Sequence, residues 1–356
     1  METLADYGTV AYFGVQTFAT GIYVSWFGLF DRAAAAQLAL CLLVVALALA
    51  TLEQRQRQNQ RHHDAGRRFE RMEPVTLRGR AAAGAVAICA LPVFFGFLLP
   101  TGILIALASG ASQILLSPRY LAFLQHSLTL AGIAAGLTVA AAMVMGFNAR
   151  LRPTRGTQAA MRIAGIGYAV PGGVIAVGLL FPFAAFDNWL DAIMEAQFGI
   201  DTGLLITGSI WLMIAAYMVR FMAVALNAYE SGLSTVNPNM DAVARTLGQG
   251  PVPMLRRVHM PILRPSILTA LLIVFVDVMK ELPATLILRP FNYDTLAVQA
   301  HRLASDERLA EAAVPSLVIG AVGLLPVALL CWSIGREGRH TRNAVDAAQG
   351  QVSGTV

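Results

Sequence analysis

Long apolar runs, separated by short polar connections rich in arginine, dominate the sequence. A helix needs about 20 apolar residues to cross a hydrocarbon core of roughly 30 Å, because each residue rises about 1.5 Å. Lipid cannot satisfy the backbone of an open strand, so each run is read as a helix. The pattern therefore predicts an all-α polytopic membrane protein with about seven transmembrane helices, at 33–52, 81–107, 127–149, 163–186, 204–226, 265–288 and 314–334.

Two of these runs contain charge, and one further uncharged stretch is not counted as a span. Arg220 lies near one end of the run 204–226, where its long side chain is expected to reach the lipid headgroups. The run 265–288 contains three charged residues. Tyr7–Phe30 is uncharged, but its four glycines and scattered Thr and Gln make it a poor lipid-facing helix, so we expect it outside the membrane.

The composition supports a membrane protein and argues against catalysis. The 356 residues are 56% hydrophobic and only 13% charged, which is more apolar surface than one soluble core can bury. Cys41, Cys89 and Cys331 lie singly in apolar runs, and the adjacent His62 and His63 lie in a basic segment. Neither a metal site nor a cofactor is expected, and no nucleophile motif suggests a membrane enzyme.

The arginines are distributed unevenly between the two sides of the predicted membrane. Twenty of them lie in or beside one set of connections, and five lie in the opposite set. By the positive-inside rule the arginine-rich set is cytoplasmic, which places the N-terminus outside and the C-terminus inside. Topology thus accounts for the net charge of +5, and nucleic acid is not an expected partner. The segments 53–80 and 336–356 are then a basic cytoplasmic linker and a cytoplasmic C-terminal tail.

The connection between the fifth and sixth runs has its own helix signals. Asn237 followed by Pro238 is a typical helix start, and Gly248 lies where a left-handed C-terminal cap would fall. A second helical piece is expected from about Pro251 to Met260, ending at Pro261. The pattern predicts a short helix presented to the cytosol.

The spacing of this loop resembles the coupling loop of importer-type ABC permeases, whose pattern is E-A-A, three residues, G, nine residues and I-x-L-P. The matching positions are Ala242, Val243, Ala244, Gly248, Val258, His259, Met260 and Pro261, and the implied coupling helix is Asp241–Gly248. Ala242 replaces the usual Glu, with Asp241 just before it, so a polar contact from this position is left open. The resemblance implies a MetI-like permease fold and a coupling helix that docks on an ATPase. An ordinary interhelical loop is the alternative.

The same resemblance implies the partners of the chain. They are ABC ATPase subunits, a periplasmic substrate-binding protein, and a second permease half in the lipid bilayer of a bacterial inner membrane. The chain itself is not expected to be an enzyme, because a phosphate-binding G-x-x-x-x-G-K-[ST] loop needs a lysine and the only one is Lys280. A secondary transporter or channel is the main rival, since several spans with buried charge fit either class.

Three charged residues lie deep in the sixth run. Asp277 is twelve residues beyond Pro265, which is roughly 18 Å along a helix and so past the membrane midplane. Lys280 at i+3 and Glu281 at i+4 can pair with it, which lowers the cost of burial but leaves one net negative charge. Two interpretations stay open. The three groups line the translocation pathway or a gate, or they pair with each other and with a neighbouring helix and fix its rotation.

Two segments resemble ferric-iron importer permeases. They are Asp277–Ala297, which reads DVMKELPATLILRPFNYDTLA, and Tyr168–Gly173, which reads YAVPGG. In the second segment Pro171 and Gly172 are expected to kink the fourth helix, and Gly173 to permit close packing.

The ferric-iron resemblance covers most of 81–334 and implies a second permease domain of six spans over 81–335. It implies Fe(III) as the substrate, although nothing in the residues independently selects this ion, which prefers oxygen ligands. Permeases for thiamine, polyamines, phosphonates or sulfate remain alternatives.

A weak internal repeat links the two ends of the chain. A shift of 278 residues aligns Met1 with Met279, Leu4 with Leu282, Phe13 with Phe291, Thr17 with Thr295 and Ala19 with Ala297. Both segments then continue into an apolar run with a basic end, as expected for internal duplication in a transporter. We expect residues 1–52 to be the tail of a first permease half; were the chain complete, two copies would have to assemble.

Overall fold

The computed structural model describes residues 2–60, 76–111, 117–324 and 327–328, and every regular element in them is helical. The N-terminal elements are α1 (Glu2–Ala5), α2 (Gly8–Tyr12), α3 (Phe18–Tyr23), the π-helical turn η1 (Val24–Gly28) and α4 (Arg32–Gln60). The middle of the chain forms α5 (Gly79–Val93), η2 (Phe94–Leu98), α6 (Leu99–Ser109), α7 (Pro118–Leu151), α8 (Arg155–Ile166), the 3-10 turn η3 (Gly167–Ala169) and α9 (Gly172–Phe198). The remainder forms α10 (Ile210–Leu233), α11 (Pro238–Thr246), α12 (Pro251–Met254), η4 (Leu255–His259), α13 (Met260–Met279), α14 (Pro283–Leu288), α15 (Leu296–Ser305) and a last helix, Leu309–Leu324.

The predicted all-helical membrane fold is confirmed. Six helices among the described residues are long and apolar enough to cross a membrane: Arg32–Glu53, Gly79–Ser109, Pro118–Leu151, Gly172–Phe198, Ile210–Leu233 and Pro251–Met279. The described part of the seventh predicted run is the apolar helix Leu309–Leu324. Several predictions fall outside the described residues: His62, His63, Cys331, the linker positions 61–75 and the tail 336–356. Residues 53–60 continue α4 rather than opening the linker.

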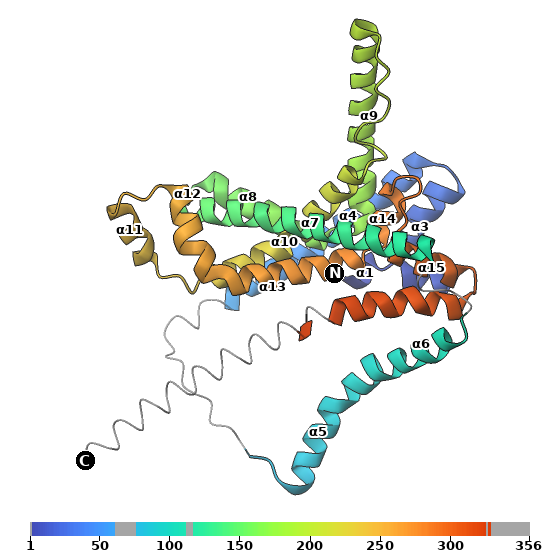
Figure 1. Cartoon of the computed structure of the whole chain (residues 1–356), viewed down its shortest axis with the longest axis horizontal. Helices are drawn as coiled ribbons and strands as arrows, with labels where there is room; N and C mark the ends of the chain where they lie inside the picture. The colour runs from blue at the N-terminus through green and yellow to red at the C-terminus, as the bar shows by residue number, and fades with distance from the viewer. Residues whose placement is uncertain (1, 61–75, 112–116, 325–326, 329–356) are drawn as a thin grey trace.

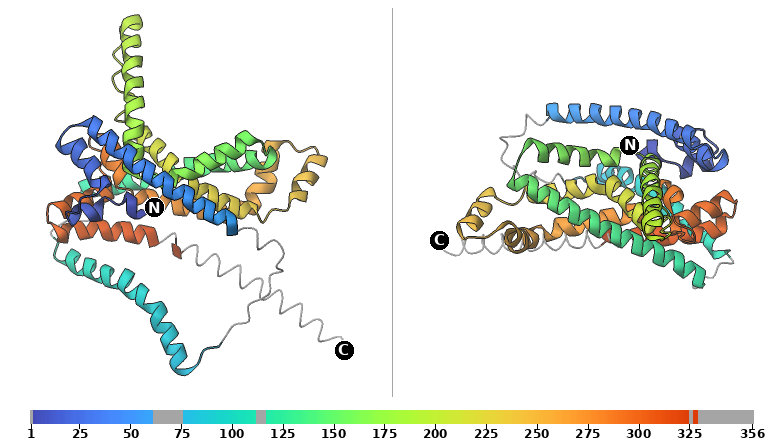
Figure 2. Two further views of the ribbon diagram at one scale, coloured as in Figure 1. Left: turned by 180° about the vertical axis from the view of Figure 1, so that it is seen from behind. Right: turned by 90° about the horizontal axis from the view of Figure 1, so that it is seen from above.

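The core is a bundle of α7, α10 and α13, which lie side by side (Figures 1 and 2). From α7, Ala131, Ala134 and Ala142 are fully buried. Gly146 brings α7 against Tyr229 of α10, because a Cβ at Gly146 would lie 2.6 Å from the Tyr229 ring. Small residues let helix backbones approach closely inside a membrane, where van der Waals packing holds helices together.

The fourth predicted run, 163–186, is divided in the structure. α8 and η3 end before Val170, which is extended with ψ 125°, and α9 begins at Gly172 and continues to Phe198. A residue before proline is pushed out of the helical region, and proline cannot donate a bond inside a helix. The prediction of a kinked helix at Pro171 and Gly172 is therefore wrong, since these residues start a helix.

The sixth run, predicted at 265–288, is also shifted. A continuous span begins at Pro251 and passes through Pro261, which is tolerated because it lies in the first turn of α13 after the π-helical turn η4. The span ends at Met279, and α14 begins only at Pro283. The prediction that the helix breaks at Pro261 is wrong, and Glu281 lies in the break after α13 rather than on it. The fifth run, predicted at 204–226, is α10, which begins after the capping hydroxyl of Ser209.

Two apolar helices extend away from the bundle (Figure 1). The helix Gly79–Ser109 buries none of its most apolar window against the rest of the described chain. α9 projects from the bundle, and the loop after it returns to the helix, where Asp187 accepts hydrogen bonds from the amides of Ile206 and Thr207. Their apolar surfaces therefore meet lipid or another subunit.

The repeat between the chain ends has a counterpart in local structure. Gly14 and Asn292, which are 278 residues apart, both have positive φ, at 67° and 60°. Thr17 and Thr295 both cap a helix by accepting from the amide three residues later, at 3.3 and 3.4 Å. The stretch Tyr7–Phe30 forms short helices, and none of the six candidate spans lies in it.

Candidate functional site

The predicted short helix after α10 is present as α11. Asn237 caps it by accepting from the amide of Asn239 at 2.9 Å, and Pro238 occupies its first turn. Gly248 ends the turn beyond it with φ +73°, a conformation that favours glycine. The local helix signals were thus sufficient to predict this element.

α11 has an apolar outer face and a buried inner face. Met240, Val243 and Leu247 are exposed, with 72% of Leu247 accessible. Together with Val258 and Arg257 they line a groove of about 510 Å³. We call Met240, Val243 and Leu247 the outer face of α11; Met240 and Leu247 were not among the predicted site residues.

The inner face of α11 is held by a charged network. Ala244 and Asp241 are buried, and the Asp241 carboxylate accepts from Arg150 Nε at 2.6 Å and is 2.7 Å from His259 Nε2. Burial alone would raise the pKa of Asp241, but the hydrogen bonds from Arg150 and His259 outweigh it and hold the pKa below its ordinary value. The first acidic position of the loop therefore faces the permease itself.

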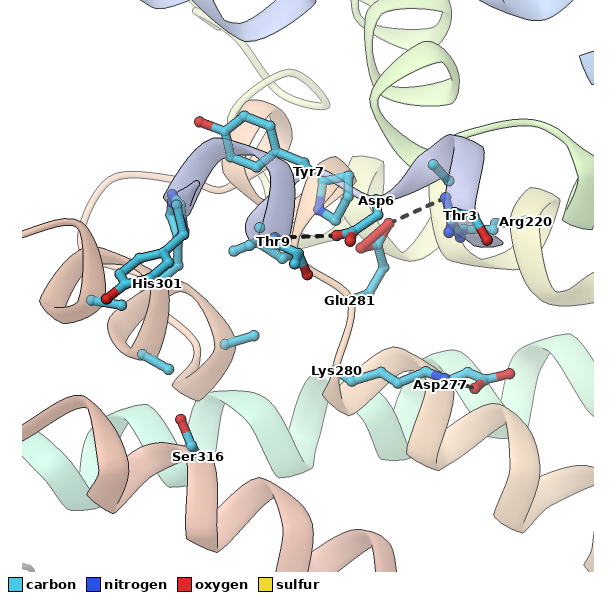
Figure 3. Close-up of a pocket in the computed structure, with 18 of the residues that line it drawn as sticks. Thr3, Asp6, Tyr7, Thr9, Arg220, Asp277, Lys280, Glu281, His301 and Ser316 are labelled. Carbon is cyan, nitrogen blue, oxygen red and sulfur yellow. Dashed lines mark hydrogen bonds and ion pairs between the residues drawn. The ribbon is translucent and has the colours of Figure 1, made fainter. Parts of the chain in front are cut away.

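A second feature is a cavity of about 740 Å³, here called the central cavity (Figure 3). Its wall combines residues 3–13 of the N-terminal segment, Arg220 of α10, residues 277–283 and part of α15. Asp277 and Lys280 form an ion pair at 3.0 Å, as the i+3 spacing predicted. The Tyr7 ring packs in tilted arrangements against Tyr23 and His301, with centroid distances of 3.9 and 5.3 Å.

Arg220 turns into this cavity and does not reach the headgroups, so that prediction is wrong. Its Nη1 lies 3.5 Å from Glu281 Oε1, and the side chains are 12% and 2% exposed. Within the described residues, Arg220 Nε, Arg220 Nη1 and Glu281 Oε2 have no hydrogen-bond partner. A buried charge pair with unused hydrogen-bonding atoms therefore lies at the cavity wall.

The glycines of the YAVPGG segment make room for this pair. A Cβ at Gly172 would overlap Glu281 Oε1 and Arg220 Nη1, and one at Gly173 would lie 3.3 Å from the Tyr23 hydroxyl. That hydroxyl donates to the carbonyl of Pro283. Gly173 thus permits the predicted close packing, and Gly172 serves the same purpose rather than a kink.

Sequence reasoning missed the partners that complete both features. Arg150 lies in the last turn of α7, His259 ends η4 and Arg220 lies in the middle of α10. No local signal marks what these basic residues contact. Among the described residues, no three of His, Cys, Asp and Glu lie close enough together to hold a metal ion.

Residues 132–335 match the family model described as the inner membrane component of binding-protein-dependent transport systems. A putative 2-aminoethylphosphonate transport system permease protein of Salmonella typhimurium is 27% identical over 263 residues, which cover 70% of this chain and 92% of the relative. An Fe(3+)-transport system permease protein of Haemophilus influenzae is 23% identical over 340 residues, which cover 93% of this chain but 63% of the relative. Among solved structures, a bacterial alginate ABC transporter in complex with its periplasmic protein aligns with a TM-score of 0.56 at 17% identity, over 70% of this chain and 92% of that one.

Proposed function

The chain belongs to the family of binding-protein-dependent transport system inner membrane components, and we propose that ferric iron is the solute it carries. It is the permease subunit of an ABC importer, a multi-pass inner membrane protein that receives its solute from a binding protein. It is not an enzyme, because ATP is hydrolysed by a separate subunit.

The outer face of α11 supports a coupling role for this helix. Met240, Val243 and Leu247 expose apolar surface at helical spacing on a nine-residue helix. Apolar side chains presented in this way are typical of a helix that docks in the groove of a partner. We propose that the ATPase contact lies here, with Gly248 ending the turn after α11 and the next span beginning at Pro251.

The central cavity is the proposed position of the translocation pathway. An ion pair at membrane depth is costly, and at 3.5 Å, with Arg220 Nε, Arg220 Nη1 and Glu281 Oε2 lacking hydrogen bonds within the described residues, the Arg220–Glu281 pair holds the fold only weakly. A pair of this kind can exchange partners as a solute passes. We propose that Asp277, Lys280 and Glu281 line the pathway and that Gly172 and Gly173 keep it open beside α9.

Ferric iron and an aminophosphonate are the two substrates to be separated. The Asp277–Ala297 segment resembles ferric-iron permeases, and the Haemophilus relative matches 93% of this chain. The Salmonella relative has the higher identity but matches 70% of it. Ferric iron is the proposal, and 2-aminoethylphosphonate is the alternative.

Residues 1–52 are proposed to be the tail of a first permease half, joined through 53–80 to a second domain over 81–335. The positive φ shared by Gly14 and Asn292 and the caps shared by Thr17 and Thr295 support this repeat. A second permease half, or a second copy of the chain, would complete the transporter.

The test is uptake by proteoliposomes that contain this chain with its cognate ATPase and binding protein. We expect ATP-dependent uptake of radioactive Fe(III), lost when Leu247→Asp places a charge on the outer face of α11. The control is Leu204→Asp, which changes another exposed leucine outside α11. Uptake of 2-aminoethylphosphonate and not of Fe(III) would show that the aminophosphonate is the substrate. Uptake without ATP would show that the chain is a secondary transporter.

A further inference from the structure

The carboxylate of Asp241 lies at the meeting point of three membrane spans. Asp241 is 7% exposed, and both of its oxygens have partners inside the permease. A partner subunit that docks on the outer face of α11 would meet Met240, Val243 and Leu247 instead. Asp241 is thus poorly placed to contact the ATPase, although it lies within the coupling helix.

Arg150 connects this carboxylate to two of the spans. It lies in the last turn of α7, and its Nε donates to Asp241 Oδ2 at 2.6 Å. Its Nη1 and Nη2 donate to the carbonyls of Leu233 and Val236, at 3.1 and 3.0 Å, where α10 ends. The Leu233 carbonyl also accepts from the Val236 amide at 3.1 Å, so the guanidinium fork adds a second donor to it and supplies a donor to the Val236 carbonyl. These contacts fix α7, α10 and α11 to one another.

His259 connects the same carboxylate to the third span. The residue is fully buried, and its Nε2 lies 2.7 Å from Asp241 Oδ1. Its ring packs edge-on against Phe147 of α7, with centroids 5.1 Å apart. Because His259 ends η4, which continues directly into α13, a displacement of Asp241 acts on the start of that span.

We propose that Asp241, with Arg150 and His259, is a joint that transmits movement of the coupling helix to α7, α10 and α13. This inference rests on the proposed ABC importer function. It assigns two roles to opposite faces of α11. The outer face binds the ATPase, and the Asp241 joint passes the movement of α11 to the membrane spans. Asp241 is therefore a positioning residue for transport.

The experiment compares variants of the full chain in the reconstituted complex with its ATPase and binding protein. Asp241→Asn keeps the shape of the side chain but removes its charge. We expect the ATPase to copurify as with the wild type and to hydrolyse ATP, while the solute transported per ATP hydrolysed falls about tenfold or more, the effect of weakening charged hydrogen bonds. Leu247→Asp should instead prevent the ATPase from copurifying with the permease.

Two further variants are needed, one as a matched control and one as an independent test of the joint. Asp306→Asn makes the same chemical change at an exposed aspartate far from α11 and should leave the transport ratio unchanged. Arg150→Lys retains the charge near Asp241 but cannot make the forked contacts to Leu233 and Val236. It should give an intermediate ratio, and it tests the proposal even if Asp241→Asn fails to fold.

The result that overturns the proposal is a wild-type ratio of transport to hydrolysis in both Asp241→Asn and Arg150→Lys, or loss of the ATPase in Asp241→Asn as in Leu247→Asp. Failure of the proposed importer function would differ from either outcome, because the wild-type complex would then show no ATP-dependent uptake at all.

Discussion

Two buried arginine–carboxylate pairs lie at different levels of the same bundle, and they are built in opposite ways. Arg150 and Asp241 are 2.6 Å apart, and all three nitrogens of the Arg150 fork make hydrogen bonds. Arg220 and Glu281 are 3.5 Å apart, and atoms of both side chains lack hydrogen bonds within the described residues. The first pair is tight and the second is loose.

This difference separates a part that transmits force from a part that changes state. A buried polar network with its hydrogen bonds made is rigid, because any displacement leaves charged groups unpaired. A buried pair with poor geometry adds little stability, since the cost of desolvation is not recovered. We therefore expect the Asp241 joint to move as a unit and the Arg220–Glu281 pair to rearrange.

The largest effect is expected from filling the space beside the loose pair. Gly172→Leu would drive a side chain into Arg220 and Glu281 and force them apart. We expect ATP-dependent uptake below about a tenth of the wild-type rate, with the protein still present in the membrane. Gly178→Leu is the matched control on the same helix, because a Cβ there meets nothing within 4 Å. Equal uptake by the two variants would contradict a role for the pair in transport.

An intermediate effect distinguishes the two pairs by stability. Glu281→Leu leaves Arg220 buried without a partner and should cost about 3 kcal/mol, most of which Arg220→Met in the same chain should restore. Asp241→Leu with Arg150→Met should not recover in this way, because the Val236 carbonyl then loses the donor from Arg150 and His259 loses the Asp241 carboxylate. Unfolding in detergent micelles of Glu281→Leu, Asp241→Leu and the two double variants measures the recovery at each pair. Similar recovery of stability at both pairs would contradict the distinction between a tight Arg150–Asp241 pair and a loose Arg220–Glu281 pair.

The smallest effect concerns pH. The pKa of Asp241 is lowered in the folded chain, so its stabilisation is complete above the ordinary value of 3.8 and is lost as the pH falls through the lower native pKa. The stabilisation that wild-type Asp241 provides relative to Asp241→Asn should then fade only as the pH drops below about 3.8. Its complete loss already at pH 5 would show that the aspartate is not held ionised by its partners.

Local signals predicted the elements, and long-range contacts decided the sites. The Asn237 cap of α11 and the Asp277–Lys280 pair join residues two and three positions apart, so both could be predicted. The partner of Asp241 lies 91 residues away on α7, and only the packing of the bundle brings it there. The same is true of Arg220, whose position near the end of an apolar run suggested lipid headgroups until α9 and α14 enclosed it.

The errors at helix boundaries have a shared cause. Pro171 and Pro283 both mark the start of a new helix, yet each lies inside a run that was predicted as one continuous helix. Hydropathy indicates whether a segment lies in the membrane, whereas a proline indicates where one helix ends and the next begins, because it cannot donate a backbone hydrogen bond. The central cavity lies where such restarts occur, because they leave polar backbone and charged side chains that need a polar lining.

The helix Gly79–Ser109 has a consequence for the life of the protein in the cell. Because nothing in the described chain covers its most apolar part, its neighbours in the finished assembly decide how well it is accommodated. We expect a copy synthesised in excess of its companion subunits to be recognised as an orphan and degraded. The abundance of this permease would then follow the supply of its companions more closely than the activity of its own promoter.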